Sequence, residues 1–191
     1  MIYLLAGIAI FFGAHCVSIF ASAWRDRMIA KLGEGPWKGL YSIVSIGGFA
    51  LMLWGFGLSR HDPVALYTSP IWLRYVTAIL MLPVFPLLFA TYLPGRIKTT
   101  MKHPMLAATK FWALAHLLAN GMLGDVLLFG SFLAWAVVDR ISLKHRTARA
   151  NITAPTSKLN DAIAVILGLV VYVAFVKWLH VKWFGVAPLL F

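Results

Sequence analysis

Six long apolar segments, separated by short polar loops, dominate the chain. A helix that crosses the hydrocarbon core of a bilayer needs about 20 apolar residues, and a short or re-entrant segment needs fewer. The pattern therefore predicts an all-α fold, a polytopic membrane helical bundle of about six transmembrane segments. We expect these segments to form a single integral membrane domain over residues 1–191. They cover approximately residues 2–23, 38–58, 71–93, 104–120, 123–138 and 161–180.

Composition supports a membrane protein. Of the 191 residues, 61% are hydrophobic and only 12% are charged, whereas a soluble domain has about 25% charged residues. The first apolar run, at residues 2–23, is longer than the hydrophobic region of a signal peptide, which has about 7–15 residues. No transit-like extension rich in Ser and Arg precedes it. We therefore expect a protein of the bacterial inner membrane whose main partner is the lipid bilayer.

The net charge of +11 resides mainly in loops. Lys and Arg are enriched in the cytoplasmic loops of membrane proteins. The loops after the first, third and fifth segments hold twelve basic residues, and the opposite side holds four. This asymmetry predicts that these three loops are cytoplasmic and that both termini are periplasmic. The sequence has no basic patch beyond the residues that set the membrane topology, so we expect no nucleic-acid partner. The twelve residues are Arg25, Arg27, Lys31, Lys38, Arg96, Lys98, Lys102, Arg140, Lys144, Arg146, Arg149 and Lys158.

Two prolines interrupt the third segment. Proline removes a helical hydrogen bond and clashes with the preceding turn. Pro83 and Pro86 should therefore kink residues 71–93. Kinks in membrane helices often open space for a ligand, and tighter packing of the helix is the alternative explanation.

Two histidines inside apolar segments are the main candidates for chemistry. An imidazole is costly in hydrocarbon unless it faces the protein interior and has a partner. At 1.5 Å per residue, His15 lies about 13 Å and His116 about 19 Å from the predicted cytoplasmic surface. Because these depths differ by only about one turn, a metal or a haem b between the first and fourth segments could take one axial ligand from each. The alternative is an interhelical hydrogen bond from each imidazole to a carbonyl or hydroxyl group.

Neighbours at helical spacing fit a cofactor site. Ser18 shares the face of His15 and could be the hydrogen-bond partner that a metal-bound imidazole usually has. Trp112 and Asn120 share the face of His116, where they offer an aromatic wall and a hydrogen-bonding group. We therefore place all three among the residues that bind the cofactor.

Two further polar residues belong to the fourth segment. His103 precedes Pro104 at its predicted cytoplasmic start, and Lys110 lies about two turns inside. A lysine at this depth either extends towards the surface or pairs with an anion. A haem propionate is such an anion, so we predict cofactor contacts for both residues; a plain interface position for His103 and an extended Lys110 are the alternatives. No HExxH, CxxC, Walker or GxGxxG motif occurs, and no catalytic residue can be named.

Several strings together resemble the NnrU family of bacterial membrane proteins. They are LGEGPWKGLYSIVSIGGFALMLWGFG, LYTSPIWLRYV, LPGRIKTTMKHPML, KFWALAHLLANG and LLFGSFLAWAVVDRISLK. The stretch from His103 to Gly121, HPMLAATKFWALAHLLANG, is the most specific, and the resemblance covers nearly the whole chain. The family is linked to nitrite and nitric oxide metabolism in denitrifying bacteria. Its plant and cyanobacterial branch is the 15-cis-zeta-carotene isomerase, a haem b protein.

The resemblance implies that His15 and His116 match the two axial haem ligands of the isomerase branch. That branch has cysteine at the position of Ala113, so isomerase activity does not carry over directly. We therefore expect an NnrU-type haem b protein, with iron bound by the two histidines, that acts in nitrite or nitric oxide metabolism or in cis–trans isomerisation of a polyene. Its ligand would be an apolar substrate or a small gas molecule.

Two other functions stay open. The segment from Lys102 to Ala108 faintly resembles the R-H-P-x-Y-x-G string of small membrane methyltransferases, which use S-adenosylmethionine. Lysine, leucine and alanine replace the arginine, tyrosine and final glycine of that string, and the C-terminal cofactor motif rich in Arg and Glu is missing. The second alternative is a structural or transport protein without a cofactor.

Overall fold

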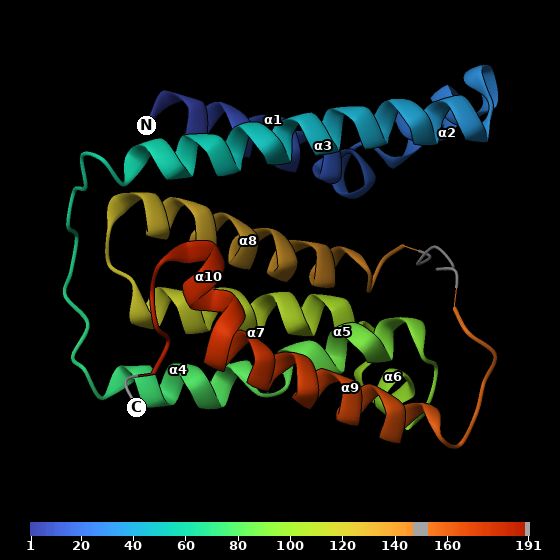
Figure 1. Cartoon of the computed structure of the whole chain (residues 1–191). Coiled ribbons are helices and arrows are strands. Elements are labelled where there is room, and N and C mark those ends of the chain that lie inside the picture. Colours follow the sequence, from blue (N-terminus) through green and yellow to red (C-terminus); the bar gives the residue numbers. More distant parts are fainter. Residues whose placement is uncertain (147–152, 190–191) are drawn as a thin grey trace. The chain divides into compact units, whose positions relative to one another are not determined.

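The computed structural model describes residues 1–146 and 153–189 and is helical almost throughout. Arg149, one of the basic loop residues, lies outside the described residues. Among the described residues the only extended pairing is an isolated antiparallel bridge between Ala65 and Met122. The helices in Figure 1 are α1 (Ile2–Phe20), α2 (Ser22–Leu32), α3 (Glu34–Ser59), α4 (Leu73–Met81), α5 (Val84–Tyr92), α6 (Arg96–Met101), α7 (Pro104–Ala119), α8 (Leu123–Ser142), α9 (Asn160–Ala174), the π-helical turn η1 (Phe175–Leu179) and α10 (His180–Phe184).

Each of the six predicted apolar segments contains a helix, but only four stretches are long and apolar enough to cross a membrane. These are Ile2–Phe20, Glu34–Ser59, Leu73–Tyr92 and Asn160–Phe184. The helix α7 has 16 residues, about 24 Å at 1.5 Å per residue, which is shorter than the hydrocarbon core of about 30 Å. The helix α8 has 20 residues but contains Asp125, Asp139 and Arg140. Four spans are therefore supported, and the expectation of about six is not confirmed.

The described residues form two compact units. Unit 1 comprises residues 1–67 and 121–144, and unit 2 comprises residues 68–120, 145–146 and 153–189. Unit 1 contains α1, α2, α3 and α8, and unit 2 contains the remaining helices. Each unit is described by itself.

In unit 1, α1 and α3 run antiparallel and in close contact (Figure 1). Glycines allow this approach, because small residues let two membrane helices bring their backbones together. A Cβ atom on Gly7 would clash with the backbone of Met52, and one on Gly48 would lie 2.7 Å from the backbone nitrogen of Phe11. Gly55 is similarly tight against the backbone at Leu4. The close contact between α1 and α3, called the α1–α3 seam below, therefore depends on glycine having no side chain at these three positions.

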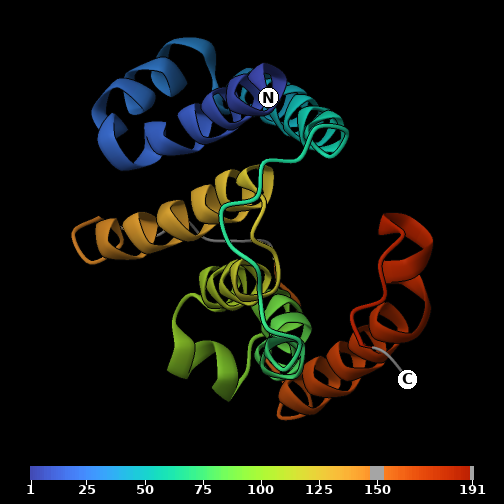
Figure 2. The ribbon, with the colours of Figure 1, turned by 90° about the vertical axis from the view of Figure 1, so that its left-hand side faces the viewer.

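Unit 2 has its core between α5 and α7. Val84 and Leu87 of α5 pack with Ala107 and Ala108 of α7, and all four are buried. The break between α4 and α5 falls at Leu82 and Pro83, which confirms the interruption predicted from the prolines. Figure 2 shows α9, η1 and α10 as one continuous, bent helical stretch.

Polar contacts join the start of α9 to the start of α6 within unit 2. The Asp161 carboxylate accepts hydrogen bonds from the backbone N–H groups of Arg96 (2.8 Å) and Ile97 (3.1 Å). The Asn160 amide donates to the Pro94 carbonyl at 2.9 Å. The two bonds to Asp161 satisfy two of the N-terminal N–H groups of α6, which have no partner in the helix itself. The loops before α6 and before α9 therefore meet at one end of unit 2.

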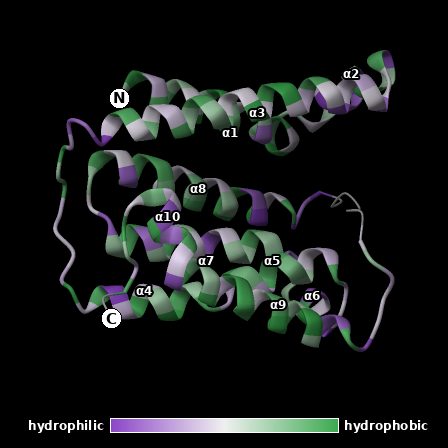
Figure 3. Cartoon of the chain, viewed as in Figure 1, coloured by the Kyte–Doolittle hydropathy of each residue, from purple (hydrophilic) through white to green (hydrophobic). Residues whose placement is uncertain are grey.

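The long helices consist mainly of hydrophobic residues, coloured green in Figure 3, and many of these residues are exposed. The exposed fractions of Ile43 and Ile46 on α3 are 71% and 69%, and that of Trp178 in η1 is 66%. Large exposed apolar areas of this kind mark an interaction surface. Together with the four candidate spans, they indicate a membrane protein.

The α1–α3 seam yields a test by glycine replacement. Gly7→Ala should destabilise the protein by about 1–3 kcal/mol, the usual cost of overpacking, because the new methyl group meets the Met52 backbone. Gly13→Ala, on the same helix, has nothing within 4 Å of the added atom. It should be neutral or stabilising by about 0.5–1 kcal/mol, the helical advantage of alanine over glycine. Thermal unfolding of both variants in detergent, followed by circular dichroism, measures the difference. Equal melting temperatures of the Gly7→Ala and Gly13→Ala variants would contradict the close backbone contact between α1 and α3.

Candidate functional site

His15 lies in the middle of an aromatic cluster in unit 1. Its Nδ1 atom is 2.8 Å from the carbonyl oxygen of Phe11, one turn earlier on α1. The imidazole ring packs on Phe11, with ring centroids 4.1 Å apart. Tyr41 of α3 lies at 5.4 Å and Trp135 of α8 at 5.5 Å, the latter perpendicular to the imidazole. Three helices therefore hold the ring in place.

His116 occupies an equivalent position on α7 in unit 2. Its Nδ1 atom is 2.8 Å from the carbonyl oxygen of Trp112, again one turn earlier. The Trp112 ring packs beside the imidazole with centroids 5.3 Å apart. The Asn120 amide donates to the His116 carbonyl at 2.9 Å and so closes the last turn of α7. The structure thus brings together three residues that the sequence grouped.

The two histidines share one hydrogen-bonding arrangement. A carbonyl oxygen can only accept a hydrogen bond, so Nδ1 must carry the proton in each ring. In a neutral imidazole the lone pair then lies on Nε2, which is the atom that can bind a metal. Metal-binding histidines usually donate their other N–H to a carbonyl or carboxylate in this way. The Nδ1 partners lie in the same helix as each histidine, whereas the alternative interpretation placed such partners on another helix.

The remaining predicted site residues lie along the same two helices. Ser18 is one turn after His15 on α1, in unit 1. His103 precedes the first residue of α7, and Lys110 is half-buried further along that helix in unit 2. Seven residues separate His103 from Lys110, so they share a face of α7, turned roughly 120° from His116 at 100° per residue. Only the long lysine side chain can reach around to the His116 face.

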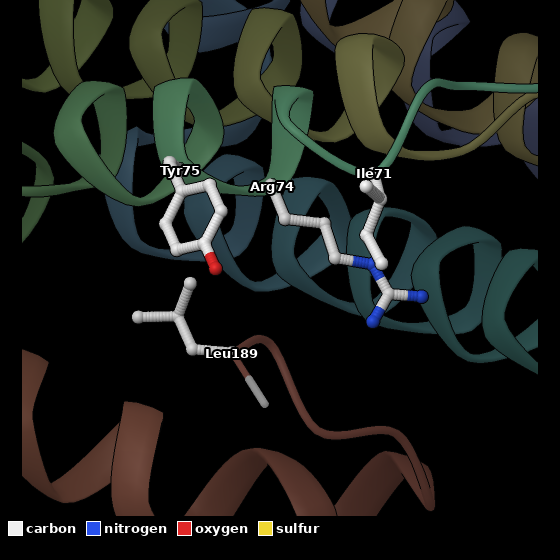
Figure 4. A pocket seen from close by; sticks show the side chains of 4 residues that line it. All are labelled: Ile71, Arg74, Tyr75 and Leu189. Atoms are coloured by element: carbon white, nitrogen blue, oxygen red, sulfur yellow. The ribbon is translucent and has the colours of Figure 1, made fainter. Parts of the chain in front are cut away.

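The described residues contain no cluster of three or more His, Cys, Asp or Glu side chains suited to a metal ion. A small open hollow in unit 2 is lined by Ile71, Arg74, Tyr75 and Leu189, where the C-terminal segment folds back against α4 (Figure 4). None of the predicted site residues lines it.

A family model described as NnrU protein matches residues 3–188. The chain belongs to the NnrU family. No curated protein and no solved structure matches it.

The most specific NnrU-like stretch, from His103 to Gly121, occupies the whole of α7 and the turn that follows. His116 and its partners Trp112 and Asn120 all fall within it. His15 lies on α1, within the matched range as well. The family match thus covers both histidines, and each has the same local hydrogen bond.

Sequence reasoning missed several neighbours of His15 in this NnrU chain. Tyr41 and Trp135 reach the imidazole from α3 and α8, and nothing in the local sequence of α1 indicates them. Two buried polar atoms near this cluster, Ser45 Oγ and Trp135 Nε1, have no hydrogen-bond partner among the described residues. Buried polar groups almost always have partners, so these two atoms are exceptions among the described residues of unit 1.

A further histidine of unit 2, His180, also has a backbone partner for its Nδ1 atom. It lies on α10, and its Nδ1 atom is 2.7 Å from the Val186 carbonyl oxygen. It is therefore a third histidine whose Nε2 atom carries the lone pair, and it provides a necessary comparison in any test of the ligands.

Proposed function

We propose that this NnrU protein binds haem b, with the Nε2 atoms of His15 and His116 as the axial ligands of the iron. The observation that carries the proposal is the shared Nδ1 hydrogen bond to the preceding turn, 2.8 Å in both residues. It holds each ring in one tautomer and directs the basic nitrogen away from its own helix. The resemblance of these positions to the ligands of the isomerase branch supports the same pair.

The surroundings of both histidines suit a large apolar cofactor. Phe11, Tyr41 and Trp135 enclose the first imidazole, and Trp112 packs against the second. Such aromatic walls exclude water and fix the orientation of each ring. Bound haem would supply a one-electron redox centre and, after loss of one imidazole, a position for a small gas molecule or an apolar polyene.

Localisation follows from the charges. We propose a multi-pass protein of the bacterial inner membrane with cytoplasmic basic loops and periplasmic termini. In unit 2, the bonds of Asn160 and Asp161 to the 94–97 segment hold two of the basic loops at the same end. This agrees with a common side for the loops after the third and fifth segments, as the positive-inside rule requires.

The ligand assignment predicts the spectra of single variants. His15→Ala and His116→Ala should each lose haem or convert it from a six-coordinate to a five-coordinate species, because each removes one axial nitrogen. Absorption spectra of the purified variants, oxidised and reduced, measure this change. His145→Ala changes an exposed histidine and should behave as the wild type.

His180→Ala separates the two possible ligand pairs. If His180→Ala gives a five-coordinate spectrum while His15→Ala stays six-coordinate and fully loaded, His180 takes the place of His15. Two fully loaded, six-coordinate variants at positions 15 and 116 would exclude both as ligands. A purified protein without haem would favour the methyltransferase or a role without a cofactor.

Lys110 should affect haem affinity but not the coordination of the iron. A charge-assisted hydrogen bond from this half-buried lysine to a propionate contributes about 1.5–3 kcal/mol. Lys110→Met should therefore weaken haem binding about tenfold and leave the axial-ligand spectrum unchanged. Titration of the haem-free protein with haem measures the affinity. An unchanged affinity would mean that Lys110 extends to the membrane surface instead. His103→Ala should have a smaller effect, since His103 lies at the start of α7.

The proposed topology predicts where reporters work. A periplasmic reporter, such as alkaline phosphatase, should be active when fused after Phe191 or before Met1, and a cytoplasmic reporter should be inactive there. Fusions in the loop that follows α8 should give the opposite pattern. A C-terminal fusion that is active only in the cytoplasm would overturn the orientation or the number of spans.

A further inference from the structure

The helix α2 differs from every other helix in unit 1, because none of its residues is buried. It has 11 residues and joins the ends of the antiparallel helices α1 and α3 (Figure 1). Ala21 breaks the chain from α1, with φ −133° and ψ 39°. Gly33, with φ 87°, ends α2 in a conformation that favours glycine. The helix is therefore a separate element at one end of the α1–α3 pair, and not an extension of either span.

An apolar stripe runs along α2. Trp24, Met28 and Leu32 are spaced by four and so lie on one face of the helix. The exposed fraction of Trp24 is 44% and that of Leu32 is 45%. Within the described part of the chain, the ring contact of α2 is an edge-on contact between Trp24 and Trp37 of α3, with centroids 5.7 Å apart. Unit 1 thus leaves much of this stripe uncovered.

Basic side chains follow one edge of the stripe. Arg27 lies three residues after Trp24, and Lys31 lies three residues after Met28, so each neighbours the stripe on the helix surface. Neither makes an ion pair with any residue that the structure describes. Arg25, by contrast, bonds to the Asp26 carboxylate. Two positive charges therefore border the apolar stripe without an acidic partner from unit 1.

This combination matches one kind of surface. A helix with an apolar face and bordering Lys and Arg side chains lies in the interfacial plane of a bilayer, with its apolar face in the acyl boundary and its charges among the headgroups. Tryptophan is enriched at the same level. The position of α2 fits this level, because α1 ends at Phe20 after an apolar stretch long enough to span.

We propose that α2 lies in the membrane interface and binds anionic phospholipid headgroups through Arg27 and Lys31. Trp24, Met28 and Leu32 insert into the acyl boundary of the same leaflet, which is the cytoplasmic one in the proposed topology. The partner is an anionic phospholipid. Its phosphodiester carries a negative charge, and its headgroup has no positive group that would neutralise this charge, so it complements Arg27 and Lys31. The proposal stands independently of haem binding.

The test measures lipid selectivity of the full-length protein in vesicles. The protein is reconstituted in phosphatidylcholine with a trace of spin-labelled phosphatidylglycerol or spin-labelled phosphatidylcholine, and electron spin resonance gives the motionally restricted fraction of each. The wild type should prefer phosphatidylglycerol, and Arg27→Gln/Lys31→Gln should lower this preference about fivefold. That ratio corresponds to about 1 kcal/mol for the two charges together, within the roughly 1 kcal/mol that each basic side chain contributes at an anionic surface. High salt should abolish the preference of the wild type.

Two double variants serve as controls. Arg60→Gln/Arg74→Gln removes the same charge from outside α2 and should leave the preference unchanged. Arg27→Lys/Lys31→Arg keeps the two charges and should retain the preference for phosphatidylglycerol. This variant separates an effect of charge from an effect of misfolding. Equal restriction of both lipids by the wild type would overturn the proposal and leave α2 to an acidic protein partner. An equal loss of preference in Arg60→Gln/Arg74→Gln would overturn it too, because the effect would then come from total charge.

Discussion

A neutral imidazole inside an apolar helix has one N–H group and one lone pair, and the partner of the N–H decides what the lone pair can do. In His15 and in His116 the N–H bonds to the carbonyl of the preceding turn. This bond removes the cost of an unsatisfied donor in an apolar environment. It also leaves the basic nitrogen on the far side of each ring, as a metal ligand requires. The proposed haem chemistry depends on this one local interaction, which occurs in both units.

Packing holds each histidine in place by a different means. In unit 1, glycines bring α1 against α3, so that Tyr41 lies beside the His15 ring, and Trp135 approaches from α8. In unit 2, alanines play the corresponding part, since Ala107 and Ala108 let α7 pack closely on α5. Small residues thus set the distances between helices, and aromatic side chains fill the space around the imidazoles. Polar chemistry is confined to a few positions within an otherwise apolar framework.

The sequence was sufficient for features that depend on local patterns. Apolar runs predicted the helices, and Pro83 marked the break between α4 and α5. The apolar pattern also singled out His15 and His116. It did not separate α2 from the first segment, because this break is a single backbone change at Ala21. It placed helices at α7 and α8, but their crossing of the membrane is not confirmed, since α7 is short and α8 contains Asp125, Asp139 and Arg140.

The rest required three-dimensional contacts. Tyr41 and Trp135 are far from His15 in the sequence, and only the packing of α3 and α8 on α1 brings them to the ring. The same holds for Asp161, which caps α6 from the start of α9. Such tertiary contacts have no signal in hydrophobic periodicity.

The most direct measurement is the absorption spectrum of the full-length protein, purified after expression with ample haem, in its oxidised and reduced forms. The account predicts one haem b per chain and a low-spin, six-coordinate spectrum with sharp α and β bands on reduction, as two imidazole ligands produce. Protein that is folded and monodisperse but carries no haem, or haem whose spectrum shows a single protein ligand in both redox states, would contradict it.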